Sequence, residues 1–207
     1  MLKFENIQKS FGEKQVLRSV SLSLKNGDIC SLSGMSGCGK TTLLRIAAGL
    51  ETADDGIVTA EGKIAFSFAE ARLFPKVTVL ENVTCVMNEK NKKERESRAR
   101  KYLSLMELSD AEALFPEELS TGMAARVSLA RAMAFEGDIY LLDEPFKSLD
   151  GKIKKDVMDS MREFLKEKIC FFISHDPLES EYFATKKYRL QNGVLEEESS
   201  HFSNDHP

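Results

Sequence analysis

A glycine-rich stretch, GMSGCGKTT at residues 34–42, matches the phosphate-binding pattern G-x-x-x-x-G-K-[ST] and lies between an apolar run and a helix-like run. Its glycines let backbone N–H groups converge on one point, where the positive end of the following helix also acts. Lys40 can reach the β- and γ-phosphates of a nucleotide, and the Thr41 hydroxyl can ligate Mg²⁺. This context favours a nucleoside-triphosphate site over a chance glycine-rich turn. The predicted contacts are Gly34, Ser36, Gly37, Cys38, Gly39, Lys40, Thr41 and Thr42.

An acidic pair ends the apolar run IYLLD, about a hundred residues downstream of the glycine-rich stretch. Asp143 would hold Mg²⁺ through water, and Glu144 could polarise the attacking water as a general base. Carboxylates often end strands at a protein surface, so the pair alone carries little information. Together with the phosphate loop, it predicts a nucleoside triphosphatase with Thr41 and Asp143 at the metal.

A third motif lies between these two. The residues LSTGM, at 119–123, are followed by AARVSLARAMA. Ser120 is a natural N-cap and Gly122 opens the amides of a helix start, so the segment offers a second anion site, although helix capping alone would also explain it. The longer run, including Arg126, resembles the LSGGQ-type signature of ATP-binding cassette (ABC) ATPases.

Other motifs similar to those of ABC ATPases follow in order, and the resemblance covers about residues 2–195. The residues SLD at 148–150 look like the D-loop, SHD at 174–176 looks like the switch-histidine segment, and Phe11 stands where the family stacks an aromatic ring on adenine. A lone histidine or aromatic residue can also be structural. The resemblance implies ATP and Mg²⁺ as cofactors, Lys40, Glu144 and His175 as catalytic residues, and Phe11, Ser120, Gly122 and Asp150 as further cofactor contacts.

Two positions depart from the family pattern. The Q-loop glutamine of the family follows a strand ending in Phe, and the position after Phe68 holds Ala69 here. An alanine can neither ligate Mg²⁺ nor contact the attacking water. The replacement therefore puts in question both the affinity for Mg²⁺ and the coupling of hydrolysis to a partner. The signature carries Thr121 in place of its first glycine, and a β-branched residue is strained there if the position requires a positive φ.

The elements that position these motifs alternate between strand and helix. Short strands are expected in the first third, with a helix at 40–50. The apolar runs at 139–143 and 169–174 lack alternation, which is typical of parallel strands covered on both faces. A turn at 191–193 predicts a final hairpin. The pattern predicts an α/β fold, and the resemblance implies a P-loop NTPase core of the ABC type with an N-terminal antiparallel β subdomain.

A helical insertion is expected in the middle of the chain, at approximately 78–135. Within it, Thr78 with Glu81 and Ser109 with Glu112 have the spacing of capping boxes, in which two side chains satisfy the amides of a first helical turn. The resemblance makes this insertion the helical subdomain of one ATPase domain. The predicted bounds are 1–195 for that domain and 196–207 for a polar, disordered tail.

The composition is that of an ordinary globular protein of 207 residues. A net charge of -4 argues against nucleic acid as the main partner. No apolar run approaches the ~20 residues that span a bilayer, and the first residues lack a signal-peptide core, so we expect a cytoplasmic protein. The resemblance implies a place on the inner face of the cell membrane, where the protein would be peripheral. Four cysteines without metal-type spacing predict free thiols.

The resemblance implies that two such domains, either two copies or one copy and a homologous ATPase subunit, pair head to tail around two ATP molecules. Their closing and opening would drive separate membrane-spanning subunits. The segment at 69–79, with Leu73, Phe74, Pro75 and Val77, is either the docking groove for those subunits or part of the core. The residues of the LSTGM and DEPFKSLD motifs are most similar to those of importer ATPases of the nitrate, sulfonate and taurine group.

Two alternative functions differ in class. The first is a nucleotide-responsive regulatory or binding subunit with weak hydrolysis, because Ala69 replaces the glutamine. The second is a cassette protein acting on DNA or the ribosome, which predicts tandem cassettes or a coiled-coil insertion and a basic face. It ranks last, because the sequence contains one cassette, no heptads and an acidic charge balance.

Overall fold

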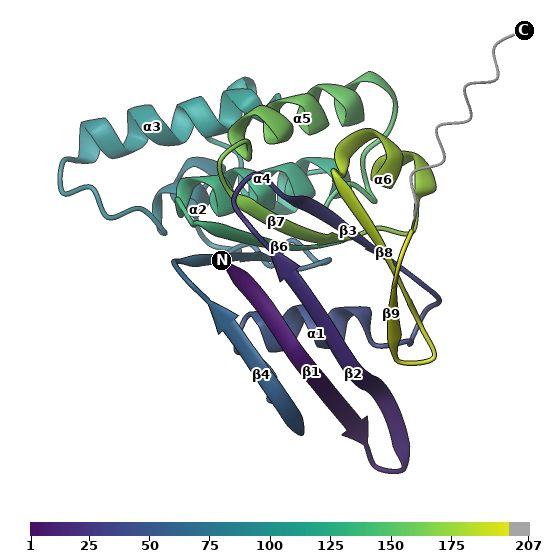
Figure 1. Ribbon diagram of the computed structural model, residues 1–207. Coiled ribbons are helices and arrows are strands. Elements are labelled where there is room, and N and C mark those ends of the chain that lie inside the picture. The colour runs from purple at the N-terminus through teal and green to yellow at the C-terminus, as the bar shows by residue number, and fades with distance from the viewer. Residues whose placement is uncertain (199–207) are drawn as a thin grey trace, which may run out of the picture.

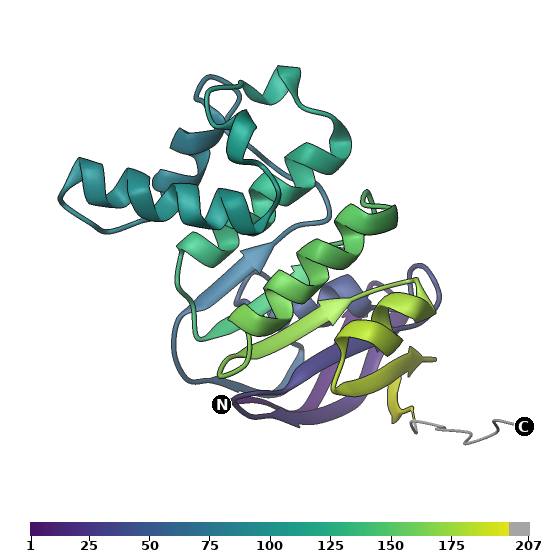
Figure 2. The same cartoon turned by 90° about the horizontal axis from the view of Figure 1, so that it is seen from above.

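The computed structural model describes residues 1–198, which form two β-sheets flanked by helices (Figures 1 and 2). The strands are β1 (Leu2–Phe11), β2 (Lys14–Leu24), β3 (Ile29–Ser33), β4 (Asp55–Ala60), β5 (Ile64–Ser67), β6 (Ile139–Asp143), β7 (Ile169–Ile173), β8 (Lys186–Gln191) and β9 (Val194–Glu197). The helices are α1 (Lys40–Ala47), α2 (Val79–Thr84), α3 (Lys92–Leu105), α4 (Thr121–Ala134), α5 (Gly151–Phe164) and α6 (Pro177–Phe183). Two short 3₁₀ helices span Ser109–Ala111 and Pro116–Glu118.

The larger sheet has the order β5-β6-β7-β3-β8-β9, and its first five strands are parallel. Every residue of β6 and β7 is buried, which explains why neither sequence alternates between apolar and polar residues. The final hairpin, β8–β9, is antiparallel and turns where the sequence predicts. The smaller, antiparallel sheet has the order β2-β1-β4, so β4 and β5, although consecutive, belong to different sheets.

Two hydrophobic cores lie on opposite faces of the larger sheet. On one face, α1 and the smaller sheet pack against the parallel strands, and Phe4 of β1 meets Phe171 of β7 edge to face at 5.9 Å. On the other face, helices α2 to α6 cover the sheet, and Phe146, Phe172 and Phe183 form an aromatic cluster. Both faces of the central strands are therefore covered, and their ends remain as the natural place for a site.

The helical insertion contains α2, α3 and α4, which lie together beside the parallel sheet in Figure 2. The capping box at Thr78 and Glu81 is confirmed, because each side chain accepts a hydrogen bond from the other residue's backbone N–H, at 3.2 and 2.8 Å. The capping box expected at Ser109 and Glu112 is wrong. Ser109 lies inside a 3₁₀ helix whose N-cap is Leu108, and the Glu112 carboxylate instead pairs with a guanidinium of α3.

The first two residues of the tail predicted at 196–207 are part of a strand. Glu196 and Glu197 belong to β9, where they pair with Arg189 and Tyr188 of β8. Cross-strand pairing to the edge of a sheet is a long-range effect that the polar composition of this segment conceals. The remainder of the predicted tail, from 199, lies outside the described residues. Within residues 1–198, no helix combines the length and the apolar character needed to cross a membrane.

Candidate active site

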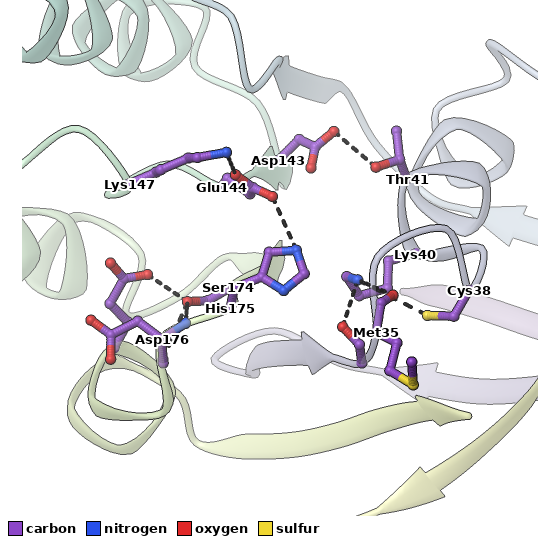
Figure 3. A network of polar contacts seen from close by, with 12 residues as sticks. Met35, Cys38, Lys40, Thr41, Asp143, Glu144, Lys147, Ser174, His175 and Asp176 are labelled. Carbon is purple, nitrogen blue, oxygen red and sulfur yellow. Dashed lines mark hydrogen bonds and ion pairs between the residues drawn. The ribbon is translucent and has the colours of Figure 1, made fainter.

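The carboxyl ends of three neighbouring parallel strands carry the residues that the motifs single out. The phosphate loop follows β3, Asp143 and Glu144 lie at the end of β6, and His175 follows β7. Because β6, β7 and β3 are adjacent and parallel, these segments meet at one edge of the sheet, as Figure 3 shows. The fold thus brings together residues that are more than a hundred positions apart in the sequence.

The phosphate loop is shaped by its glycines and centred on Lys40. A Cβ at Gly34, where φ is 143°, would lie 2.4 Å from the Leu190 carbonyl oxygen, so this position needs glycine. The buried Lys40 ammonium donates to the carbonyl oxygens of Gly34 and Met35, at 2.8 and 2.9 Å. Gly39, also at positive φ, is the N-cap of α1. The loop therefore presents a cation and a helix N-terminus in one concave turn.

Thr41 and Asp143 form the second part of the site. The Thr41 hydroxyl donates to Oδ2 of the buried Asp143 across 3.2 Å. Burial raises the pKa of Asp143 and the neighbouring charge of Glu144 raises it further, while the bond from Thr41 opposes them. A hydroxyl and a partly desolvated carboxylate are oxygen donors of the kind that Mg²⁺ takes, and a divalent cation would relieve the cost of burying this carboxylate.

Glu144 is held from two sides. Its Oε1 lies 3.1 Å from His175 Nε2, and its Oε2 lies 2.6 Å from the Lys147 ammonium (Figure 3). The hydrogen bond to Glu144 raises the pKa of Lys147, so the lysine stays charged. Glu144 also has a φ of 50°, the left-handed region that non-glycine residues seldom occupy, and such strain clusters at functional sites. The backbone thus turns this carboxylate toward the histidine.

The remaining predicted contacts lie on other elements. Ser120 is the N-cap of α4, where its hydroxyl accepts from the Met123 N–H at 3.2 Å, and Asp150 is the N-cap of α5. Gly122 touches the D-loop, because a Cβ there would lie 2.8 Å from the Ser148 carbonyl oxygen. Phe11, at the end of β1, is 51% exposed. No hydrogen bond or ion pair among residues 1–198 joins these residues to the phosphate loop.

Residues 17–147 match the model of the family described as ABC transporter. The chain belongs to the ABC transporter family. It carries the ATP-binding ATPase domain of that family, as the order of its motifs implies. The fold agrees, because a solved dimeric ATP-binding cassette in a post-hydrolysis state, bound to ADP and Pi, is 29% identical with a TM-score of 0.88 and matches 96% of this chain and 98% of its own. The predicted α/β fold of the ABC type is confirmed.

Two curated relatives of this ABC ATPase are named for import. The "probable sulfate/thiosulfate import ATP-binding protein CysA" of Chlorella vulgaris is 40% identical over 98% of this chain and 93% of its own length. A CysA protein of Halalkalibacterium halodurans is 36% identical over 95% of this chain, which spans only 60% of that relative's length. These names agree with an import-type ATPase. The solutes in the names, sulfate and thiosulfate, differ from the nitrate, sulfonate and taurine that the motif residues favour. They give no support to a regulatory subunit.

The two departures from the ABC pattern have different structural consequences. Thr121 is the first residue of α4 and is not among the described residues with positive φ, so the expected strain is absent. Ala69 is exposed in the irregular segment after β5, and it offers no polar side chain there. Arg131 of α4 ties this segment to the signature helix by donating to the carbonyl oxygens of Ala71 and Arg72, at 2.9 and 3.1 Å.

Sequence reasoning missed two features of this ABC ATPase site. The first is Lys147, whose contact with Glu144 depends on a turn after β6 that no motif defines. The second is a group of polar side chains behind His175, in which Ser174 bonds to Glu179. The spacing of Ser174, Asp176 and Pro177 does indicate a helix start, but the partner of Glu179 comes from a helix more than twenty residues upstream.

Proposed function

We propose that this ABC ATPase hydrolyses ATP between two copies of itself, or one copy and a homologous subunit, and thereby drives the membrane-spanning subunits of an importer at the inner face of the cell membrane. The observation that carries the proposal is the meeting of Lys40, Thr41, Asp143, Glu144 and His175 at one edge of the parallel sheet. Residues 1–195 would act as one ATPase domain, with 78–135 as its helical subdomain.

The chemistry follows from the donors and acceptors in place. The loop amides and the Lys40 ammonium bind the β- and γ-phosphates and stabilise the charge that develops on them. The Glu144 carboxylate accepts a proton from the attacking water, whose oxygen bonds to the γ-phosphorus while the bridging oxygen leaves with ADP. His175, at 3.1 Å from Glu144, orients that carboxylate. Thr41 and Asp143 would hold Mg²⁺, which when bound neutralises phosphate charge.

A partner cassette would complete each site. The N-terminus of the signature helix, with Ser120 and Gly122, lies on a different element from the phosphate loop and can serve a second copy as an anion site. Asp150 begins the helix that follows the D-loop, beside the same segment. Phe11, exposed at the end of β1, would stack on the adenine of the ATP bound to its own phosphate loop.

A groove in the helical insertion is the proposed docking place for the membrane-spanning subunits. It has a volume of about 550 Å³, and its lining combines apolar side chains, among them Phe74, Pro75 and Val77, with the charged Lys76, Glu81 and Arg95. Phe74 is 55% exposed, although it is a large aromatic residue. The buried Asn82 fixes the groove's wall by bonding to backbone groups of the 74–78 segment. Such a preformed apolar groove suits a short helix of a partner.

The cargo belongs to the same proposal. The names of the relatives suggest a small inorganic oxyanion, sulfate or thiosulfate, as the solute that the complete importer carries. The assignment applies to the whole assembly, in which the membrane-spanning subunits would carry the solute. Growth on sulfate as the sole sulfur source, with the chain deleted or carrying Lys40→Ala, tests it: growth equal to that of the wild type contradicts this cargo.

Steady-state ATPase rates test hydrolysis. We expect Glu144→Gln to lower kcat by at least about 10²-fold, because the amide cannot accept the water's proton. Glu163→Gln, an exposed change on α5, is the matched control and retains the wild-type rate. Ala69→Gln measures what the missing glutamine contributes. A wild-type rate no faster than that of Glu144→Gln contradicts the proposal and favours a nucleotide-responsive binding subunit.

Docking is tested separately by co-purification of membrane subunits with tagged chain from detergent-solubilised membranes. Phe74→Asp places a charge on the groove and should abolish co-purification. Ile57→Asp is the control, since Ile57 is an exposed apolar residue on β4, outside the helical insertion. If both variants, or neither, lose the membrane subunits, the groove is not the docking place.

A further inference from the structure

A polar network with two buried members, Ser174 and Glu179, lies next to His175. The Ser174 hydroxyl donates to Oε2 of Glu179 at 2.5 Å and accepts from the Asp176 N–H at 3.0 Å. The Ser174 side chain thus contacts Asp176, on the other side of His175, and also Glu179 of α6. Ser174 and Glu179 are 2% and 4% exposed, so water does not compete for these bonds. The backbone on either side of His175 is therefore fixed by a single buried hydroxyl (Figure 3).

Lys154 completes the network from another helix. Its ammonium lies 2.5 Å from Oε1 of Glu179 and 3.1 Å from Oδ2 of Asp176. Burial lowers the pKa of Lys154, but its bonds to the two carboxylates outweigh this and raise the pKa overall. The bond from Lys154 lowers the pKa of Asp176. Lys154 and Asp176 are consequently charged at neutral pH, and both oxygens of Glu179 have a partner.

The network connects the switch segment to the D-loop. Lys154 lies in the first turn of α5, and its backbone N–H donates to the carbonyl oxygen of Asp150 at 3.2 Å. Asp150 is the last residue of the D-loop. Lys154 therefore contacts the D-loop through its backbone and the segment at 174–176 through its side chain. This lysine links the end of the D-loop to Asp176, the residue after His175.

Stability alone does not explain a network built around the buried carboxylate of Glu179. Removing two charges from water costs several kcal/mol per ion, and well-packed apolar residues are often as stable as the ion pair that they replace. What an ion pair with satisfied oxygens does supply is a defined geometry. Here the geometry is that of the residue in contact with Glu144, since His175 Nε2 lies 3.1 Å from its carboxylate.

We infer that Lys154 and Glu179 are positioning residues for His175, whose ion pair holds the imidazole against Glu144 and couples it to the D-loop. The inference rests on the proposed function, because it assigns these residues a role in the same hydrolysis. Neither side chain contacts the phosphate loop, so ATP binding should not depend on them. Their removal should instead change the catalytic step.

The experiment measures kcat and KM for Lys154→Met and Glu179→Gln in the full chain. A misplacement of 1 Å near the chemistry can cost 10²-fold, so we expect about a tenfold fall in kcat with KM within about twofold of wild type. In a His175→Ala background, neither change should lower kcat further. Lys154→Arg, which keeps the charge, should restore most of the rate. Lys152→Met, on the same helix and 89% exposed, is the control and should retain the wild-type kcat.

The result that would overturn the inference is an equal fall in kcat in the wild-type and His175→Ala backgrounds, because that shows a role independent of His175. Hydrogen–deuterium exchange of residues 174–178 without nucleotide provides a second measurement, and Lys154→Met should speed it while Lys152→Met should not. This measurement needs no hydrolysis. If wild type proves no faster than Glu144→Gln, the proposed function fails, and unchanged exchange in Lys154→Met separately overturns the positioning role.

Discussion

Replacing Gly122 by alanine tests the contact between the signature helix and the D-loop. The added Cβ would lie 2.8 Å from the Ser148 carbonyl oxygen, which is a backbone atom that no rotamer change can move away. An ordinary carbon–oxygen contact is about 3.3 Å or longer, so α4 and the D-loop must separate by about 0.5 Å. The displaced segment begins two residues before Asp150.

The magnitudes of the two effects differ. Overpacking of this kind costs about 1–3 kcal/mol, and a chain of this length loses about 2–4 °C of Tm per kcal/mol. Since a 1 Å misplacement near the chemistry can cost 10²-fold, a shift of half that size should lower kcat by about tenfold. The expected result is thus a modest fall in Tm together with a large fall in ATPase activity.

Gly49→Ala is the matched control. Gly49 follows α1 at a φ of 68°, and a Cβ there would meet nothing within 4 Å. Alanine in this left-handed conformation costs about 1–2 kcal/mol, similar to the cost at Gly122, but it displaces no catalytic segment. Thermal unfolding and kcat are measured for both variants. If Gly122→Ala folds and keeps the wild-type kcat, or if Gly49→Ala loses as much activity, the reasoning is refuted.

Two further predictions concern the thiols and the groove. MgATP should slow the alkylation of Cys38 in the phosphate loop and leave the alkylation of exposed Cys85 unchanged. Burial raises the thiol pKa of Cys170 and should keep this residue unmodified until the chain unfolds. Mass spectrometry of the labelled peptides measures all three, and equal protection of Cys85 by MgATP would contradict the prediction. Asn82→Ala should lower the free energy of unfolding in urea by about 1–3 kcal/mol, because backbone groups of the 74–78 segment lose their hydrogen-bond partner. The control Asn88→Ala, at an exposed position, should change it by less than about 0.5 kcal/mol. Equal losses in the two variants would refute the claim that Asn82 fixes the wall of the groove.

Local signals made much of the fold and site predictable. The glycines of the phosphate loop, the unbroken apolar runs of β6 and β7 and the cap at Thr78 each act over a few residues, and the structure places them as expected. Because parallel strands align their carboxyl ends, Asp143 and His175 could be expected at the same edge as Lys40.

Long-range effects were beyond the sequence. Lys154 and Glu179 meet only because α5 follows β6 and α6 follows the neighbouring strand β7, and no spacing along the chain encodes that contact. The separation of β4 and β5 into two sheets is likewise a matter of register between distant strands. Ser109 and Glu112 have the right spacing for a capping box, but the chain there forms a 3₁₀ helix. The Glu112 carboxylate accepts a hydrogen bond from Arg100 of α3 instead.

The central claim is that the phosphate loop is half of a site that a second copy completes. Light scattering after gel filtration tests it most directly with Glu144→Gln, which we expect to bind ATP and to hydrolyse it slowly. We expect this variant to elute as a monomer without nucleotide and as a dimer with MgATP. Adding Ser120→Arg, which places a bulky cation at the N-terminus of α4, should keep it monomeric with MgATP. A Glu144→Gln chain that stays monomeric with MgATP, or a Ser120→Arg chain that still dimerises, would contradict a site shared between two copies of this chain.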